Sequence, residues 1–243
     1  MKTIGIIGGM GPLATADLFN KIVSLTEAGG DNDHIHIIID NNTEIPDRTD
    51  YIMNDGANPE KHLIKSALKL EIMGADVLVM PCNTAHFFYN RIIQYINIPF
   101  INMIEETAKE IVKSYKEKYK VGLLATEGVY NAGVYDKIFR KYSIDMVKPS
   151  AEQQKQITNI IYSIKAGKKY IDTTSFKKVM SQMKSQGAET FILGCTELPI
   201  AFQLFGIDEK CIDPTKILAC SAIDFVGGIC KDPCSKSPFP RKL

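Results

Sequence analysis

Two cysteines in similar surroundings are the residues of this chain best placed to do chemistry. Cys82 follows the apolar run ADVLVM and belongs to PCNTAH, and Cys195 ends the segment GAETFILGC. A thiol placed where a buried strand ends can be reached by a small molecule, whereas a purely structural cysteine is expected deeper within the apolar run. Each thiol is therefore a candidate acid or base.

The surroundings of the two cysteines form an internal repeat. GADVLVMPC at residues 74–82 aligns with GAETFILGC at 187–195, and IGIIGGMG at 4–11 aligns with VGLLATEG at 121–128. Both matches keep the same order and nearly the same spacing, which indicates two similar halves. The cysteines then end equivalent strands, at the sheet edge where ligands of open α/β folds bind. If the halves face each other across a cleft, a substrate between them has a sulfur on each face.

Two thiols on opposite sides of one carbon atom meet the requirement for racemisation by two bases. One group removes the proton from the carbon, and the other delivers a proton to the opposite face. A thiolate can be the base when its pKa is lowered. Small polar residues that begin a helix are expected after each cysteine, so backbone N–H groups would favour a thiolate there and hold a substrate carboxylate. At rest, one group must be a thiolate and the other a thiol.

The elements that position these thiols are predicted by alternating apolar runs and amphipathic segments. They indicate an α/β fold of two pseudosymmetric domains, each a four-stranded parallel sheet flanked by helices. Residues 1–101 plus 214–243 are expected to form the first domain, which carries Cys82, and residues 102–213 the second, which carries Cys195. The clearest helices are expected at 59–73 and 172–186, and the strands at 3–8, 34–40, 76–80, 98–101, 120–125, 144–147, 189–193 and 211–212.

The composition restricts the classes of partner. The chain has 243 residues, of which 45% are hydrophobic and 23% charged, and a net charge of +1, so no overall field favours nucleic acid or an anionic membrane. No apolar run approaches the roughly 20 residues of a membrane span, and the first residues are typical of a strand rather than a signal peptide. We therefore expect a cytoplasmic protein with free thiols. Cys230 and Cys234 are expected in an irregular tail, and we assign no function to them.

Four motifs together resemble the aspartate/glutamate racemase superfamily, specifically its aspartate racemase branch. They are GIIGGMGP from Gly5, PDR ending at Arg48, CNTAH from Cys82 and GCTELP from Gly194, and the resemblance extends to about Asp224. It implies an amino-acid racemase that needs no cofactor and no metal and that forms a homodimer of two-domain α/β subunits. It also implies that Cys82 and Cys195 are the paired acid and base.

The resemblance further implies which residues contact the substrate. Arg48 and Lys165 correspond to basic residues that bind carboxylates, and Met10 lies in the first loop. The repeat supports Thr126 independently, because it falls opposite Gly9. The full set is Met10, Arg48, Asn83, Thr84, Ala85, Thr126, Lys165, Thr196 and Glu197. The glutamate racemases of cell-wall synthesis typically carry histidine where Glu197 stands, so aspartate is the expected substrate, with glutamate next.

Several other interpretations remain beside this one. GMGPLA from Gly9 fits the dinucleotide fingerprint G-x-G-x-x-A after a strand, although Pro12 removes one backbone N–H from that loop. A metal site that uses Cys82 and His86 lacks any C-x-x-C pair, and His86 either tunes the neighbouring thiol or is an ordinary buried histidine. A hydantoin racemase or a maleate isomerase-like enzyme would keep both cysteines. A non-catalytic amino-acid-binding protein would need neither cysteine.

Overall fold

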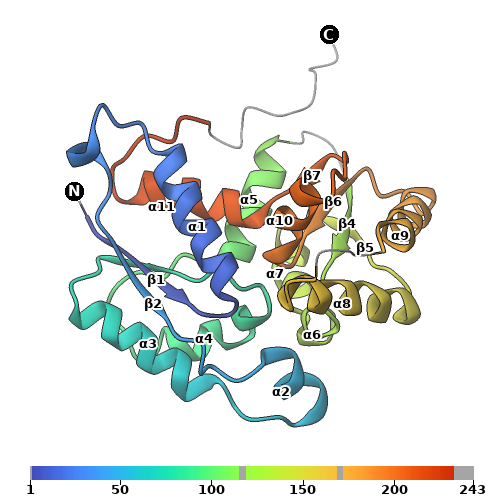
Figure 1. The fold of residues 1–243 in the computed structure, drawn as a ribbon, viewed down its shortest axis with the longest axis horizontal. Coiled ribbons are helices and arrows are strands. Elements are labelled where there is room, and N and C mark those ends of the chain that lie inside the picture. Colours follow the sequence, from blue (N-terminus) through green and yellow to red (C-terminus); the bar gives the residue numbers. More distant parts are fainter. Residues whose placement is uncertain (1, 115–118, 169–171, 233–243) are drawn as a thin grey trace.

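The computed structural model describes residues 2–114, 119–168 and 172–232 and contains two parallel β-sheets flanked by helices, as predicted. Figure 1 shows the sheets in two neighbouring units, one drawn mainly in blue and teal and the other in green to orange. Among the described residues, no helix combines the length and the apolar character that a membrane span requires.

The first sheet has the strand order β2-β1-β3, with β1 at Ile4–Gly8, β2 at Ile37–Asn41 and β3 at Val77–Val79. All residues of β1 and β3 are buried, as expected for parallel strands covered on both faces. The expected fourth strand is reduced to a single parallel bridge between Leu78 and Phe100. Pro99 explains this difference, because it has no N–H with which to extend the ladder.

The second sheet has the predicted four strands, all parallel, in the order β5-β4-β6-β7. They are β4 (Lys120–Leu124), β5 (Asp145–Val147), β6 (Thr190–Leu193) and β7 (Cys211–Ile212). Within each sheet, the strand from the first part of the repeat pairs directly with the strand that leads to the cysteine: β1 with β3, and β4 with β6. The repeat seen in the sequence is therefore a repeat of topology.

Local signals determine where the helices begin. The helix expected at 172–186 is α9 (Thr173–Ser185), and the Asp172 side chain accepts hydrogen bonds from Thr174 N at 3.1 Å and Ser175 N at 3.0 Å. The helix expected at 59–73 is α3 (Glu60–Ile72). The other helices are α1 (Pro12–Leu25), η1 (Asp31–Asp33), α2 (Arg48–Asn54), η2 (Thr84–Phe88), α4 (Tyr89–Ile92), α5 (Met103–Ser114), α6 (Glu127–Ala132), α7 (Val134–Lys141), α8 (Ala151–Lys165), α10 (Glu197–Leu204) and α11 (Pro214–Phe225).

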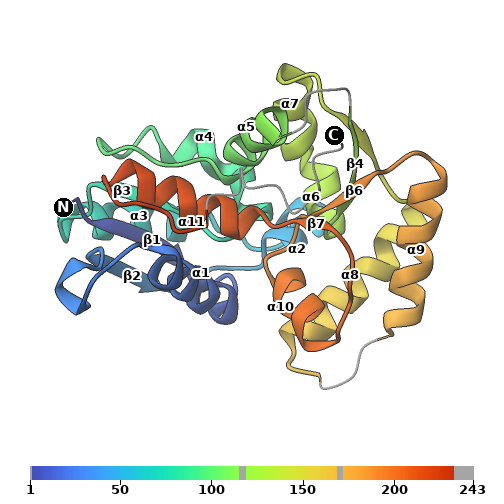
Figure 2. The same cartoon turned by 90° about the horizontal axis from the view of Figure 1, so that it is seen from above.

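Helix α11 lies with the first sheet although it comes last in the chain. Figure 2 shows it alongside the N-terminal unit, and Leu218 and Ile223 share a buried apolar cluster with Ile4 and Leu18. Helix α11 therefore packs on the first unit, and the division of the chain into domains, with residues 214–243 in the first, stays a prediction. The described part of the tail is also packed, because Cys230 is buried and pairs with Thr26 in an antiparallel bridge. Cys234 and the rest of the tail lie outside the described residues.

The first loop depends on a glycine. Gly9 has φ +91°, and a Cβ atom there would lie 2.1 Å from the carbonyl oxygen of Asn42. The loop that follows β1 can therefore pass the end of β2 only if residue 9 has no side chain.

We expect Gly9→Ala to lower the free energy of unfolding by on the order of 2 kcal/mol or more, because it adds a backbone clash to the cost of a positive φ. Gly74→Ala is the matched control: Gly74 has φ +94°, but nothing lies within 4 Å of its Cβ position. Urea unfolding of both variants would separate the two effects. Equal losses would show that the contact with Asn42 does not constrain the loop.

Candidate active site

Cys82 lies just beyond the buried strand β3, where the chain turns into η2. Its backbone N–H donates to the carbonyl of Met80 at 2.9 Å, and Thr84 begins the 3-10 helix. The residue is 5% exposed, so its thiol faces the interior of the protein rather than open surface. No side-chain hydrogen bond to its sulfur is found within the described part of the chain.

Cys195 occupies the equivalent place after β6 and has an acidic neighbour. Its sulfur donates a hydrogen bond to Glu197 Oε2 at 2.9 Å, and both residues are buried. Burial, and then the charge of Glu197, raise the pKa of the Cys195 thiol well above its usual value. The sequence led us to expect that the helix end would favour a thiolate, and this is wrong for Cys195. The first residue of α10 brings a carboxylate to that helix end, so Cys195 is a thiol at rest.

Lys165 links the two cysteines electrostatically. It ends α8, and its Nζ lies 4.0 Å from Glu197 Oε1. Burial lowers the pKa of Lys165, but attraction to Cys195, Glu197 and Cys82 outweighs that effect and raises it. The charge of one ammonium group is therefore affected by a cysteine from each half.

Arg48 holds the first loop in place. This arginine is 7% exposed; its Nη1 donates to the carbonyls of Ile45 and Pro46 at 3.3 and 3.0 Å, and its Nη2 donates to the carbonyl of Met10 at 3.1 Å. Only its Nε is buried without a partner in the described structure. Three of the five N–H bonds of the guanidinium thus organise the loop, and the buried Nε–H is one of the two that remain for a ligand.

Hydroxyl groups close the contact between the halves. Thr126 Oγ1 lies 3.4 Å from Thr84 Oγ1 and 3.4 Å from Thr49 Oγ1. Tyr135 of α7 donates to Asn83 Oδ1 at 2.7 Å, which leaves Asn83 Nδ2 buried without a recorded partner. An unsatisfied buried donor costs about 1–3 kcal/mol. The free donors of Asn83 and Arg48 therefore favour binding of an acceptor such as a carboxylate.

The remaining residues of the predicted site differ in what they contact. Thr196 is buried, with its hydroxyl 3.4 Å from Glu197 Oε2. Met10 and Ala85 are buried in an apolar cluster that also contains Cys82. Sequence reasoning missed Tyr135, which occupies an ordinary apolar position of an amphipathic helix and gives no local signal of its bond to Asn83.

His86 positions the backbone of Cys82. Its Nε2 accepts a hydrogen bond from Met103 N at 3.1 Å, so its Nδ1 carries the proton and donates to the Cys82 carbonyl at 2.8 Å. Burial lowers the pKa of His86 to about 4, so the ring is neutral near pH 7. The arrangement fits a positioning role.

His86, which was weighed for a metal, and the Gly9 N–H of the nucleotide-like loop are both engaged in hydrogen bonds. Within the described ranges, no group of three or more His, Cys, Asp or Glu side chains is arranged to hold a metal ion. The Gly9 N–H donates to Thr15 Oγ1 at 2.9 Å, so it is not free to bind a phosphate.

Comparisons with known proteins agree with this geometry. The family model for Asp/Glu/Hydantoin racemase matches residues 7–222. The chain is 30% identical to the broad specificity amino-acid racemase RacX of Bacillus subtilis over 224 residues, which covers 90% of this chain and 96% of that protein. It is similar to Picrophilus torridus aspartate racemase with a TM-score of 0.82 and 29% identity, covering 95% and 96% of the two chains. A glutamate racemase from Francisella tularensis, at 18% identity and a TM-score of 0.67 with 93% and 81% coverage, shares the fold.

The buried neutral His86 predicts a pH dependence of stability. The pKa of His86 falls from 6.5 to about 4 on folding, so between these values the unfolded chain binds a proton that the folded chain does not. The free energy of unfolding should therefore decrease as the pH falls from 6.5 towards 4, by about 3 kcal/mol in total from this group.

Unfolding of the His86→Gln variant across this range should show a shallower slope than the unmodified protein, whatever its absolute stability. Phe88→Leu, which also removes buried contacts from η2 but no titratable group, is the control and should keep the original slope. If His86→Gln also kept the original slope, a neutral, buried His86 would be contradicted.

Proposed function

The chain belongs to the Asp/Glu/hydantoin racemase family, and we propose that it interconverts the enantiomers of free amino acids, with aspartate preferred and glutamate next, by a two-base mechanism that needs neither PLP nor metal. Cys82 and Cys195 are the two bases in this proposal.

One observation carries the proposal: Lys165 lies 4.0 Å from Glu197, which accepts from the Cys195 thiol, and the pKa of Lys165 is also raised by Cys82 of the other half. A substrate bound beside Lys165 would present its α-carbon to both thiols. The buried, unpaired N–H groups of Arg48 and Asn83 are available for its carboxylates. A non-catalytic binding protein would need the cation and the donors but neither sulfur.

The local charges indicate which thiol is the acid and which is the base before the reaction begins. Cys195 keeps its proton because it is buried and faces the carboxylate of Glu197. The two-base reaction needs a base beside this acid, and we assign that role to Cys82. Its sulfur takes the α-proton of the substrate, and the two electrons of the C–H bond remain on the α-carbon. Cys195 then gives its proton to the opposite face and becomes the thiolate.

Lys165 stabilises both ends of this proton transfer. The negative charge moves from Cys82 to Cys195 during turnover, and Lys165 is attracted to both. A carbanion next to a carboxylate also gains from a nearby cation. The enzyme that results from one turnover carries the protonation pattern needed for the opposite enantiomer, so the reverse reaction restores the starting state.

The preference for aspartate is inferred from the relatives and from the cations of the site. The similarity to an aspartate racemase favours a dicarboxylate, while the similarity to a broad specificity racemase favours a wider range. Arg48 and Lys165 supply two cations, which suits a substrate with a second carboxylate. A homodimer and a cytoplasmic location complete the proposal, both from the family resemblance.

The proposal predicts that Cys82→Ser and Cys195→Ser each lose most of the activity, by roughly 1,000-fold or more, because a hydroxyl is far too weak an acid to serve as an anionic base. Purified protein would be incubated with each L-amino acid without cofactor, and the D-isomer measured by chiral separation. Cys211→Ser, on the short strand β7, is the matched control and should retain activity. Near-normal turnover by either active-site variant would contradict the paired-thiol mechanism.

The position of the label in D₂O distinguishes two bases from one. Early in the reaction from either enantiomer, the product should carry deuterium at the α-carbon while unreacted substrate stays largely protiated, because removal and delivery occur on opposite faces. NMR and mass spectrometry of the separated enantiomers would measure both. Rapid uptake of deuterium into the starting enantiomer, ahead of product, would indicate that one thiol works alone.

A further inference from the structure

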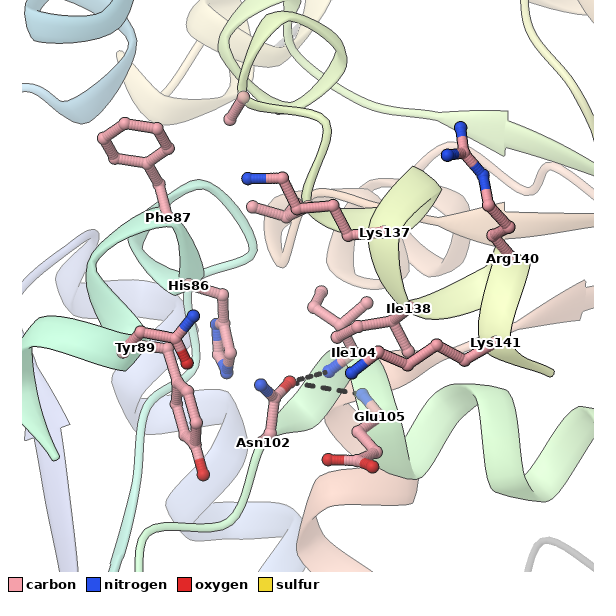
Figure 3. Close-up of a pocket in the computed structure, with 13 residues that line it drawn as sticks. His86, Phe87, Tyr89, Asn102, Ile104, Glu105, Lys137, Ile138, Arg140 and Lys141 are labelled. Atoms are coloured by element: carbon pink, nitrogen blue, oxygen red, sulfur yellow. Dashed lines mark hydrogen bonds between the residues drawn. The ribbon is translucent and has the colours of Figure 1, made fainter.

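A pocket separate from the candidate active site lies between the two halves, behind the loop that carries Cys82. It has a volume of about 590 Å³, which is in the range of small-molecule sites. Figure 3 shows its lining: residues 86–90 on one side, the start of α5 below, and α7 on the other side. None of the predicted catalytic or substrate-binding residues lines it.

The pocket has an excess of positive charge. Three cations of α7 line it, Lys137, Arg140 and Lys141, against one carboxylate, Glu105. Figure 3 shows Lys137 and Lys141 extending into the pocket, with Arg140 at its edge and pointing away. Glu105 accepts a hydrogen bond from Tyr142 at 3.2 Å.

The three cations of α7 have no ion pair within the described ranges, in contrast to the acid on the same helix. Asp136 forms an ion pair with Lys148 at 2.5 Å. Lys137 and Lys141 are four residues apart, so they are neighbours on one face of the helix and repel each other. An anion between them would relieve that repulsion.

The rest of the lining offers donors and apolar surface. The side-chain oxygen of Asn102 already accepts from the N–H groups of Ile104 and Glu105 at 3.0 and 3.2 Å, so its amide nitrogen is the group left for a ligand. Phe87, Ile104 and Ile138 supply the apolar walls. Ammonium and amide donors against apolar walls suit a small molecule with several anionic oxygens.

The walls of this pocket are bonded to the catalytic loop. His86, which lines the pocket, donates to the carbonyl of Cys82 at 2.8 Å. From the same helix as the lysines, the fully buried Tyr135 donates to Asn83 at 2.7 Å. An occupant that attracts α7 towards residues 86–90 would therefore restrain the loop from both sides.

We propose that this pocket binds a small molecule or ion with at least two phosphate or carboxylate charges, and that its occupancy restrains the loop that carries Cys82. The unpaired lysines and the free amide of Asn102 support the binding of an anion. The two hydrogen bonds to residues 82 and 83 support the restraint of the loop. This site is separate from the proposed catalytic cleft and does not depend on racemase activity.

Calorimetry of the full chain with pyrophosphate and, separately, with citrate tests the binding, at constant ionic strength set with sodium chloride. One equivalent of at least one probe should bind, and the Lys137→Ala/Lys141→Ala variant should bind it about tenfold more weakly or worse. Lys177→Ala/Lys178→Ala, which removes two exposed lysines of α9, is the matched control and should bind normally. Preference for one probe identifies the phosphate or the carboxylate as the recognised group. No binding of either probe, or equal loss in both variants, would overturn the site.

The rate of alkylation of Cys82 by iodoacetamide, followed by mass spectrometry, tests the restraint without an activity assay. The bound probe should slow alkylation in the unmodified protein and in the α9 control, and should have no effect in Lys137→Ala/Lys141→Ala. Protection that persists in this variant would place the anion in the catalytic cleft instead. An unchanged rate with the probe bound would overturn the restraint.

Discussion

The structure of the site depends on one buried electrostatic interaction, that of Lys165 with Glu197 and the two thiols. Removing a carboxylate and a thiolate from water is costly unless a cation accompanies them. Lys165 supplies that cation from the end of α8, 4.0 Å from Glu197, while Glu197 and both cysteines are buried. Lys165, Glu197 and Cys195 belong to the second half and Cys82 to the first, so the effect of Lys165 on Cys82 acts across the contact between the halves.

Near the site, the two halves meet through small residues and hydroxyl groups. Thr84 and Thr49 meet Thr126 at 3.4 Å, and a Cβ atom at Gly128 would lie 2.6 Å from the hydroxyl of Thr49. Glycine at position 128 therefore allows α6 to approach α2. Larger side chains here would separate the halves and, with them, the two sulfurs.

The two parts of the internal repeat differ in the residues that follow each cysteine. The two cysteines and the strands before them correspond, but the second residue after Cys82 is Thr84, whereas the second residue after Cys195 is Glu197. A threonine adds no charge, whereas burial and then the charge of Glu197 raise the pKa of Cys195. Two equivalent positions in a repeated fold therefore have different charged neighbours, which suits the different roles of the two thiols in the proposed reaction.

Patterns local in the chain were enough to predict the two parallel sheets, the repeat and the ends of α3 and α9 to within one residue. These follow from strand burial, helix capping and residue spacing, which are properties of neighbouring residues. The structure alone decided that Arg48 binds mainly the Met10 loop, that Tyr135 supports Asn83, and that Cys195 keeps its proton. Those results depend on burial and on charges brought from distant parts of the chain, and burial and distance exist only once the chain has folded.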